Sequence, residues 1–293
     1  METTEIIENL DELILALDKA EAQTTISDDA FREAVGRIIY RPSVSEFPSN
    51  PFSPEYREAQ LELYNSITSS TYSTDKEQTP FNFGHEIGQP FPYGTRSANT
   101  VGETLIGYGH IVKNLPIAPK SRILEIGSGY GTLAVHLAPM HVDLTCIDID
   151  IRLLDFISHR ISNFNHQTKL VHTDIHNYQP KEKFDIIVFH ESFHHFHDHL
   201  SVLQKLPNIL SNTGLVIFAA EPIVPDICPT VPYPWGLRMD GLSLRCIRNF
   251  GWFELGFTRS YFHDLLAKQN FTVQEKSIPG YHYTHIIEAR LQT

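Results

Sequence analysis

The stretch RILEIGSGYGT, residues 122–132, decides the fold that this sequence predicts. A short apolar segment, expected to be a β-strand, runs into three glycines at alternate positions, Gly127, Gly129 and Gly131, with Ser128 after the first. Glycine lets a backbone turn tightly and approach a ligand closely, and the helix N-terminus beyond such a turn favours polar or anionic groups. The stretch therefore predicts a ligand-binding turn between a strand and a helix.

The spacing of these glycines distinguishes between classes of nucleotide-binding protein. A dinucleotide-binding turn has the pattern G-x-G-x-x-G, whereas this turn reads G-x-G-x-G and has Thr132 where the last dinucleotide glycine belongs. Glu125 lies two residues before the first glycine, where its carboxylate would repel a pyrophosphate but suit an ammonium group. Both features oppose the hypothesis that the protein is a nicotinamide-dependent dehydrogenase. That class remains an alternative, which a test of NAD binding would examine.

Strands and helices alternate on both sides of the turn. We expect strands at residues 121–127, 142–148, 169–173, 184–190 and 214–220, and helices at residues 101–115, 130–137, 151–164, 200–210 and 261–268. Two more strands, residues 271–278 and 281–291, flank Pro279 and Gly280 as a hairpin. The pattern predicts an α/β fold: a doubly wound, mostly parallel seven-stranded sheet (Rossmann-like) with an antiparallel C-terminal strand.

Acids follow two neighbouring strands of this predicted sheet. Asp148 closes the second strand about 20 residues past the glycines, the separation at which an acid binds ribose hydroxyls. Asp174 follows the third strand. Because open α/β sheets bind ligands at the carboxyl ends of their strands, we expect both acids to lie beside the glycine turn.

The combination of E-x-G-x-G-x-G with an acid closing each of the next two strands resembles class I S-adenosylmethionine-dependent methyltransferases, over residues 97–293. The resemblance implies S-adenosylmethionine as cofactor and S-adenosylhomocysteine as product. It assigns the glycines to the methionine portion, Glu125 to its amino end, Asp148 to the ribose and Asp174 to the adenine amine. The full set of implied cofactor residues is Glu125, Gly127, Ser128, Gly129, Gly131, Asp148, Ile149, Asp174, Ile175 and His190. Two alternatives are a fold that uses the glycines only for packing, and a non-catalytic scaffold or binding protein.

The stretch HESFHHFHDH, residues 190–199, begins with H-E-x-x-H, the pattern of a zinc-protease helix. That chemistry needs both histidines on one helical face, but His190 ends a predicted strand. In the methyltransferase pattern this segment lines the cofactor and the acceptor, so His195, His194 and Glu191 are the candidate catalytic residues. A histidine can remove the proton of a hydroxyl acceptor, and Asp240 and Glu254 are the next candidates for that role. A divalent metal could also bind here, but no metal ligands are assigned.

Two further regions are expected to shape the acceptor site. Residues 1–96 are predicted to form a helical N-terminal extension and loop, with helices at residues 3–22, 28–40 and 54–66. Residues 221–257 form an insertion, rich in proline and aromatic residues, that suits a substrate lid. The candidate substrate-binding residues are Tyr93, Arg96, Trp235 and Arg238. We expect a small-molecule or sugar acceptor and O-methylation of a hydroxyl, with N-methylation of a small-molecule amine as the alternative.

Composition excludes several other classes of function. The formal net charge of −12 and the absence of a Lys/Arg cluster oppose nucleic acid and anionic membrane surfaces as partners. Three separated cysteines suit a reducing compartment, and the acidic N-terminus does not resemble a signal peptide, so we expect a cytoplasmic protein. The apolar stripe of the first helix predicts docking on its own domain or on a second subunit, which would make a homodimer.

Overall fold

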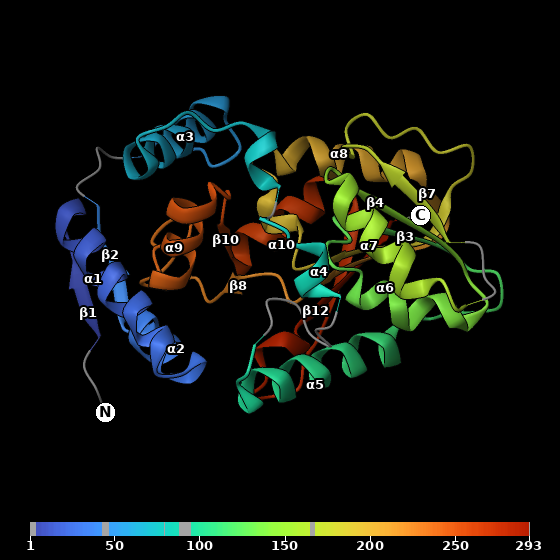
Figure 1. Cartoon of the computed structure of the whole chain (residues 1–293). Helices are drawn as coiled ribbons and strands as arrows, with labels where there is room; N and C mark the ends of the chain where they lie inside the picture. The colour runs from blue at the N-terminus through green and yellow to red at the C-terminus, as the bar shows by residue number, and fades with distance from the viewer. Residues whose placement is uncertain (1–3, 43–46, 79, 88–94, 165–167, 293) are drawn as a thin grey trace. The chain divides into compact units, whose positions relative to one another are not determined.

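The computed structural model describes residues 4–42, 47–78, 80–87, 95–164 and 168–292 (Figure 1). Within this described part the chain forms two compact units, each assembled from segments that are distant in sequence. The first unit comprises Met1–Thr79, His194–His197 and Pro222–Phe262, and the second comprises Pro80–Phe193, Asp198–Glu221 and His263–Thr293. These bounds differ from the expected division at residue 97, because the insertion groups with the N-terminal residues.

The second unit is built on a mixed sheet. Seven of the described strands lie in the order β11-β12-β7-β6-β3-β4-β5. Their bounds are Arg122–Ile126 (β3), Asp143–Asp148 (β4), Lys169–His172 (β5), Phe184–His190 (β6), Leu210–Ala219 (β7), Phe271–Lys276 (β11) and Ile286–Leu291 (β12). Neighbours from β5 to β7 pair in parallel, while β12 pairs antiparallel with both β7 and β11. The predicted fold class, including the antiparallel C-terminal strand, is confirmed.

Helices flank this sheet because its central strands are apolar on both faces. Ile123 and Leu124 of β3 and Ile187 and Val188 of β6 are fully buried, as expected for strands covered on both sides. The helices of this unit are Phe83–Glu86 (α4), Ala98–Asn114 (α5), Thr132–Leu137 (α6), Ile151–Ile161 (α7), His199–Ile209 (α8) and the second part of Arg259–Lys268 (α10). The first part of α10, up to Phe262, belongs to the first unit. α6 and α7 pack against β4, and α8 packs against β7. β3 and β6 lie between β4 and β7 in the sheet, so these helices cover strands on either side of them.

The N-terminal segment differs from its prediction at both of its first two helices. Residues Glu5–Ile7 form a strand (β1), so the helix expected at residues 3–22 begins only at Leu10–Ala22 (α1), where Asn9 caps it by accepting the Asp11 N–H. The second helix, Asp28–Gly36 (α2), has the expected Ser27 cap but ends early. Residues Ile38–Tyr40 form β2, which pairs in parallel with β1. β-Branched Ile38 and Ile39 favour that extended pairing over a helix end.

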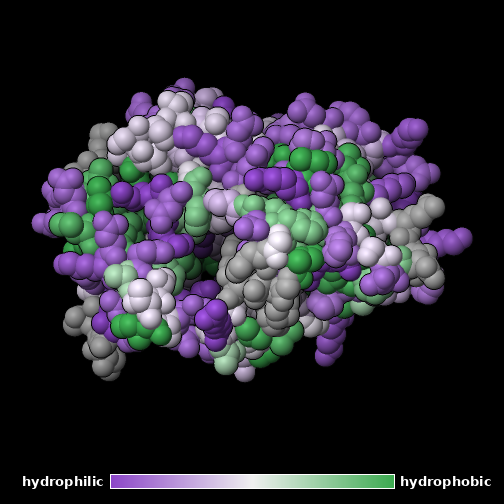
Figure 2. Space-filling model, viewed as in Figure 1, coloured by the Kyte–Doolittle hydropathy of each residue, from purple (hydrophilic) through white to green (hydrophobic). Residues whose placement is uncertain are grey.

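The apolar stripe of α1 is buried within the first unit. Leu13, Leu17 and Ala20 are buried, α1 packs on α2, and the carboxylate of Glu21 pairs with the guanidinium of Arg245. The predicted docking of this helix therefore takes place on its own unit, and burial of the stripe does not require a second copy of the chain. Over α1 and α2, at the left of the view, hydrophobic and hydrophilic residues are interspersed on the surface (Figure 2).

The insertion after β7 forms structure of its own within the first unit. Strands Ile223–Val224 (β8), Trp235–Leu237 (β9) and Leu255–Thr258 (β10) form a small sheet, and Gly241–Phe250 forms α9. Helix Pro54–Thr68 (α3) packs on both β9 and α9. Its Tyr56 hydroxyl and Gln60 amide donate to the Trp235 carbonyl at 2.9 and 3.1 Å. The insertion is thus a core element of this unit. Among the described residues, no helix has the length and apolar character that crossing a membrane requires.

Candidate functional site

The three glycines after β3 adopt left-handed backbone conformations that other residues seldom adopt. Their φ angles are +67° at Gly127, +51° at Gly129 and +65° at Gly131. A Cβ at Gly127 would lie 2.8 Å from the Ser192 Cβ, and one at Gly131 would lie 2.4 Å from Ile157 Cγ1. A Cβ at Gly129 would meet no atom within 4 Å. Packing therefore explains the outer two glycines, while the middle one borders space that a ligand could use.

Asp148 joins the end of β4 to the glycine turn. Its Oδ2 accepts the Gly129 N–H and its Oδ1 accepts the Asp150 N–H, each at 2.9 Å. Burial raises the pKa of Asp148, and the two backbone N–H donors oppose that shift. Because each carboxylate oxygen can accept more than one hydrogen bond, the group is fixed in place and still able to bind hydroxyls.

Glu125 is buried within β3, beside the same turn. The Cys146 thiol lies 3.6 Å from its Oε2 and donates to it. Burial raises the pKa of Glu125 to about 8, the hydrogen bond from Cys146 opposes this, and the charge of Asp148 adds to it. The carboxyl group is therefore largely protonated at neutral pH until a cation approaches it.

The other predicted cofactor residues lie along the same sheet edge. The Ser128 hydroxyl donates to the Glu125 carbonyl at 3.2 Å, and Oδ1 of half-buried Asp174 accepts the His176 N–H at 2.7 Å. The Ile149 carbonyl lies 2.9 Å from the His172 ring. The Ile175 side chain is buried, so only the backbone of this residue could reach a ligand.

The turn after β6 is held by an acid that the sequence analysis missed. Buried Glu221, just past β7, accepts the N–H groups of Ser192 and Phe193 at 2.9 Å each. The Ser192 hydroxyl donates to the Ile126 carbonyl at 2.7 Å, which ties this turn to the glycine turn. An acid directly after an apolar strand is the signal that pointed to Asp148, and it could have identified Glu221.

His190 and Glu191 lie at the start of this turn. The His190 ring is 5.1 Å from the ring of buried Tyr108, and its Nε2 is 3.8 Å from Glu191 Oε2. Glu191 is exposed and has a φ of +48°, an unusual conformation for a residue other than glycine. Strained residues of this kind are found more often at functional sites than elsewhere.

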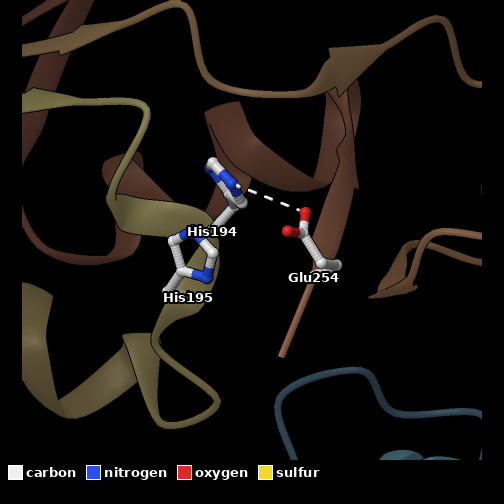
Figure 3. Close-up of side chains that lie close together, drawn as sticks. All are labelled: His194, His195 and Glu254. Carbon is white, nitrogen blue, oxygen red and sulfur yellow. Dashed lines mark ion pairs between the residues drawn. The ribbon is translucent and has the colours of Figure 1, made fainter. Parts of the chain in front are cut away.

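His194 and His195, in the short 3-10 helix Phe193–His195, meet two acids of the first unit. His194 Nε2 lies 3.7 Å from Glu254 Oε2, and His195 Nδ1 lies 3.1 Å from Glu77 Oε2. Figure 3 shows His194 facing Glu254, with His195 beside it on the same segment. The two histidine rings are 4.3 Å apart. The arrangement gives two neighbouring imidazoles a carboxylate partner each.

Arg238 determines the charge of this cluster. Its guanidinium contacts the same Glu254 oxygen that faces His194. Burial would raise the pKa of Glu254, but Arg238, His195 and His194 hold it down at about 2. Donor atoms of His194, His195 and Glu254 lie within 4.8 Å of one another, a grouping that could in principle surround a metal ion. A dication there would be repelled by the guanidinium of Arg238, which contacts the same Glu254 carboxylate.

Of the predicted substrate-binding residues, Trp235 and Arg238 belong to the first unit and Arg96 belongs to the second. Tyr93 lies outside the described residues, and Arg96 is exposed. Trp235 is a correction: it is fully buried and its indole N–H donates to the Pro51 carbonyl at 2.7 Å, which leaves no ring face for a substrate. Arg238 is engaged by Glu254. Glu77 was missed because nothing in its local sequence, TDKEQ, distinguishes it from a solvated acid.

A family model described as "Methyltransferase domain" matches residues 107–276. This match covers more than half of the chain. The chain belongs to the methyltransferase domain family. The match confirms the enzyme class and the S-adenosylmethionine cofactor that the sequence resemblance implied. No curated protein sequence matches the chain.

Solved structures with a similar fold include mitomycin 7-O-methyltransferase MmcR, at 14% identity and a TM-score of 0.52, covering 83% of this chain and 73% of that one. Protein BH2331 from Bacillus halodurans C-125 is 15% identical with a TM-score of 0.51, covering 64% of this chain and 99% of its own. The S-adenosylmethionine-dependent methyltransferase SibL is 16% identical with a TM-score of 0.50, covering 66% and 57%. At these identities the similarity concerns the fold.

Proposed function

We propose that this methyltransferase transfers a methyl group to a hydroxyl group of a small molecule or glycan. The cofactor supplies an electrophilic methyl group on a positively charged sulfur. The protein's own residues then have three tasks: to hold the cofactor, to orient the acceptor, and to remove the hydroxyl proton.

Cofactor binding is assigned to residues around the glycine turn of the second unit. Asp148 would bind the ribose hydroxyls, Glu125 the methionine ammonium group and Asp174 the adenine amine. Backbone or packing contacts would come from Gly127, Ser128, Gly129, Gly131, Ile149, Ile175 and His190. Two features support this fit. The Asp148 oxygens have spare acceptor capacity, and the space beside Gly129 is open.

Proton removal is assigned to His195, with His194 and Glu191 as the competing candidates. The observation that carries this assignment is the His195 imidazole, which lies 3.1 Å from the Glu77 carboxylate. A carboxylate partner orients an imidazole and stabilises the imidazolium that forms when it accepts a proton. His195 also follows the end of β6 by only five residues, in the segment where this family contacts its acceptor.

A small hydroxylated acceptor is favoured over a macromolecular anion. The net charge of −12 opposes nucleic acid as the substrate. The fold is compatible with oxygen methylation, since MmcR, which has a similar fold, is by name an O-methyltransferase. Arg96, an exposed cation, is kept as a proposed acceptor contact.

The experiment starts with an acceptor screen. S-adenosylhomocysteine release would be measured with phenols, activated sugars, glycans and small amines. With the best acceptor, His195→Ala should lower kcat by about 10²–10⁴-fold and leave S-adenosylhomocysteine affinity by calorimetry nearly unchanged. His197→Ala, in the same segment, should keep wild-type turnover. Near-wild-type turnover in His195→Ala would exclude this base, and transfer only to amines would replace the hydroxyl assignment.

A further inference from the structure

Arg160, in the last turn of α7, is a half-buried cation beside the glycine turn. Its Nη1 donates to the Tyr130 carbonyl at 2.6 Å, and its guanidinium lies 5.7 Å from the centre of the Phe156 ring. Burial lowers the pKa of Arg160, and the nearby Tyr108 hydroxyl opposes this shift. No carboxylate in the described part of the chain forms an ion pair with this guanidinium.

Two other arginines of the second unit do have such partners. The guanidinium of Arg122 lies 3.0 Å from the Asp185 carboxylate, and that of Arg152 lies 2.5 Å from the Asp150 carboxylate. In each case the hydrogen bond to the acid raises the pKa of the arginine. A guanidinium carries five N–H donors, and withdrawing its charge from water costs free energy unless an anion compensates it. Arg160 therefore has both the donors and the uncompensated charge to bind the anionic group of a ligand.

The contact of Arg160 with Tyr130 places this charge at the open part of the glycine turn. Tyr130 lies between Gly129 and Gly131, and a Cβ at Gly129 would meet no atom within 4 Å. The Tyr130 carbonyl, which accepts from Arg160, is thus one residue beyond the glycine that borders open space. A ligand in that space would have the guanidinium as a close neighbour.

A second charge, of opposite sign, lies in the same neighbourhood. α6, which follows the glycine turn, packs on both α5 and α7 (Figure 1). Buried Tyr108 of α5 hydrogen-bonds with the side chain of Thr132, the first residue of α6. Burial and the charge of Glu191 raise the pKa of Tyr108. The charge of Glu125 also raises it, whereas the charge of Arg160 lowers it, so both of these groups lie around one tyrosine side chain.

An amino-acid end group requires such a pair of charges. The methionine portion of S-adenosylmethionine ends in an ammonium group and a carboxylate on the same carbon atom, so a complementary site has an acid and a base close together. A guanidinium can bind a carboxylate through two parallel N–H donors, which orients the ligand as well as holding it. With Glu125 assigned to the ammonium group, the carboxylate needs a cation nearby.

We propose that Arg160 binds the carboxylate of the methionine portion of the cofactor, while Glu125 binds the ammonium group. The proposal rests on the cofactor placement given in the proposed function. Arg160 can keep its Nη1 bond to the Tyr130 carbonyl while its other donors bind the carboxylate, which ties the cofactor to the glycine turn. The site then selects cofactors that carry the whole amino-acid group.

An alternative role for Arg160 is to brace the glycine turn through the Tyr130 carbonyl alone. A brace affects every ligand of the turn equally, whereas a carboxylate partner affects only ligands that have a carboxylate. The decarboxylated analogue of S-adenosylhomocysteine, which keeps the adenosine, the sulfur and the ammonium group, separates these two roles.

The test measures both affinities by calorimetry in wild type and in Arg160→Met. Wild type should bind S-adenosylhomocysteine at least about tenfold more tightly than the decarboxylated analogue, because charge-assisted hydrogen bonds are strong. Arg160→Met should bind the two ligands with affinities within about threefold of each other, and the analogue at least as tightly as wild type does. Lys113→Met, which removes an exposed cation from α5 and changes the net charge equally, is the matched control and should keep the wild-type ratio.

Melting temperatures show whether each variant is folded, and Arg160→Gln, a neutral polar replacement, carries the same test if Arg160→Met does not fold. An unchanged ratio in the folded variant, with both ligands weakened alike, would leave only the brace and overturn the proposal. Equal wild-type affinity for the two ligands would also overturn it, since the protein would not recognise the carboxylate. Wild-type S-adenosylhomocysteine affinity in Asp148→Ala would instead overturn the placement of the cofactor at this turn. The acceptor and the base do not enter, because no methyl transfer is measured.

Discussion

The acids near the glycine turn differ in how well hydrogen bonds stabilise the negative charge of each carboxylate. Asp148 accepts two backbone N–H groups, whereas buried Glu125 has the weak thiol donor of Cys146. A thiol compensates a buried carboxylate poorly, so the uncharged form of Glu125 is favoured and its pKa rises to about 8. This difference allows a pH experiment that reports on Glu125 alone.

Glu125 should make the cofactor-free protein less stable as pH rises. Its folded pKa of about 8 lies above the ordinary value of 4.5 for a solvated glutamate, so the folded state binds its proton more tightly than the unfolded state does. Stability from this group is full below pH 4.5 and is lost as pH rises towards 8, at up to about 1.4 kcal/mol per pH unit. The melting temperature of Glu125→Gln relative to wild type should therefore increase between pH 5 and 8.

Cofactor provides the control for this experiment. An ammonium group beside Glu125 favours the carboxylate, so saturating S-adenosylhomocysteine should flatten the pH dependence of wild type and leave that of Glu125→Gln unaltered. A wild-type pH dependence identical to that of Glu125→Gln in the absence of cofactor would show that Glu125 is already ionised in the folded protein.

Positions that depend on the local backbone could be predicted from the sequence, and contacts between residues distant in sequence could not. The glycines and Asp148 follow from spacing along one strand–turn–helix unit. Trp235 was predicted to contact the substrate because its burial could not be foreseen from the local sequence. That burial depends on Pro51 and Tyr56, which are remote in sequence. Glu77 was missed for the same reason, since only the fold brings it to His195.

Among the elements, the glycine turn offers a matched pair of substitutions. Gly129 and Gly131 have similar left-handed φ angles, +51° and +65°, so a Cβ strains the backbone comparably, by about 1–2 kcal/mol, at either position. Gly131→Ala adds a clash with Ile157 Cγ1 at 2.4 Å, whereas Gly129→Ala meets no protein atom within 4 Å. The two positions should therefore fail in different ways.

Gly129→Ala should fold and lose cofactor affinity, while Gly131→Ala should lose more thermal stability before any cofactor is added. We expect at least about a tenfold weaker S-adenosylhomocysteine affinity for Gly129→Ala by calorimetry, because its methyl group enters space assigned to the cofactor. Melting temperatures of both variants provide the comparison. Wild-type affinity in a folded Gly129→Ala would remove this turn from the cofactor site.

Element types were predictable where apolar runs were long. The strands of the main sheet lie where β-branched runs end in turns or acids. The residues of β1 and β2 were predicted to be helical because a three-residue strand is too short to show an alternation of apolar and polar side chains. Their pairing also joins residues more than 30 positions apart. The sequence did contain one signal for the true start of the helix. Asn9, a residue type that often caps helices, lies inside the segment predicted as one continuous helix.

At the scale of the whole molecule, the residues proposed for the cofactor and those proposed for proton removal belong to different units. The residues assigned to the cofactor all belong to the second unit, and the histidine–carboxylate cluster belongs to the first. The first unit is assembled from the N-terminal segment, the short segment His194–His197 that follows β6, and the insertion after β7. Its stability should therefore depend on the N-terminal residues, while the cofactor affinity of the second unit should not.

Deleting residues 1–22 tests this division. The deletion removes α1 with buried Leu13 and Leu17, each worth about 1.5–3 kcal/mol of burial, and the Glu21–Arg245 ion pair. We expect the melting temperature to fall by about 5 °C or more, while S-adenosylhomocysteine affinity by calorimetry stays within about twofold of wild type, since no cofactor residue is removed. Leu15→Ala, an exposed position on the same helix, should change neither quantity.

Size exclusion checks the alternative in which α1 joins two subunits. A halved apparent mass of the deletion variant, with an unchanged melting temperature, would mean that the helix stabilises a dimer and not its own unit.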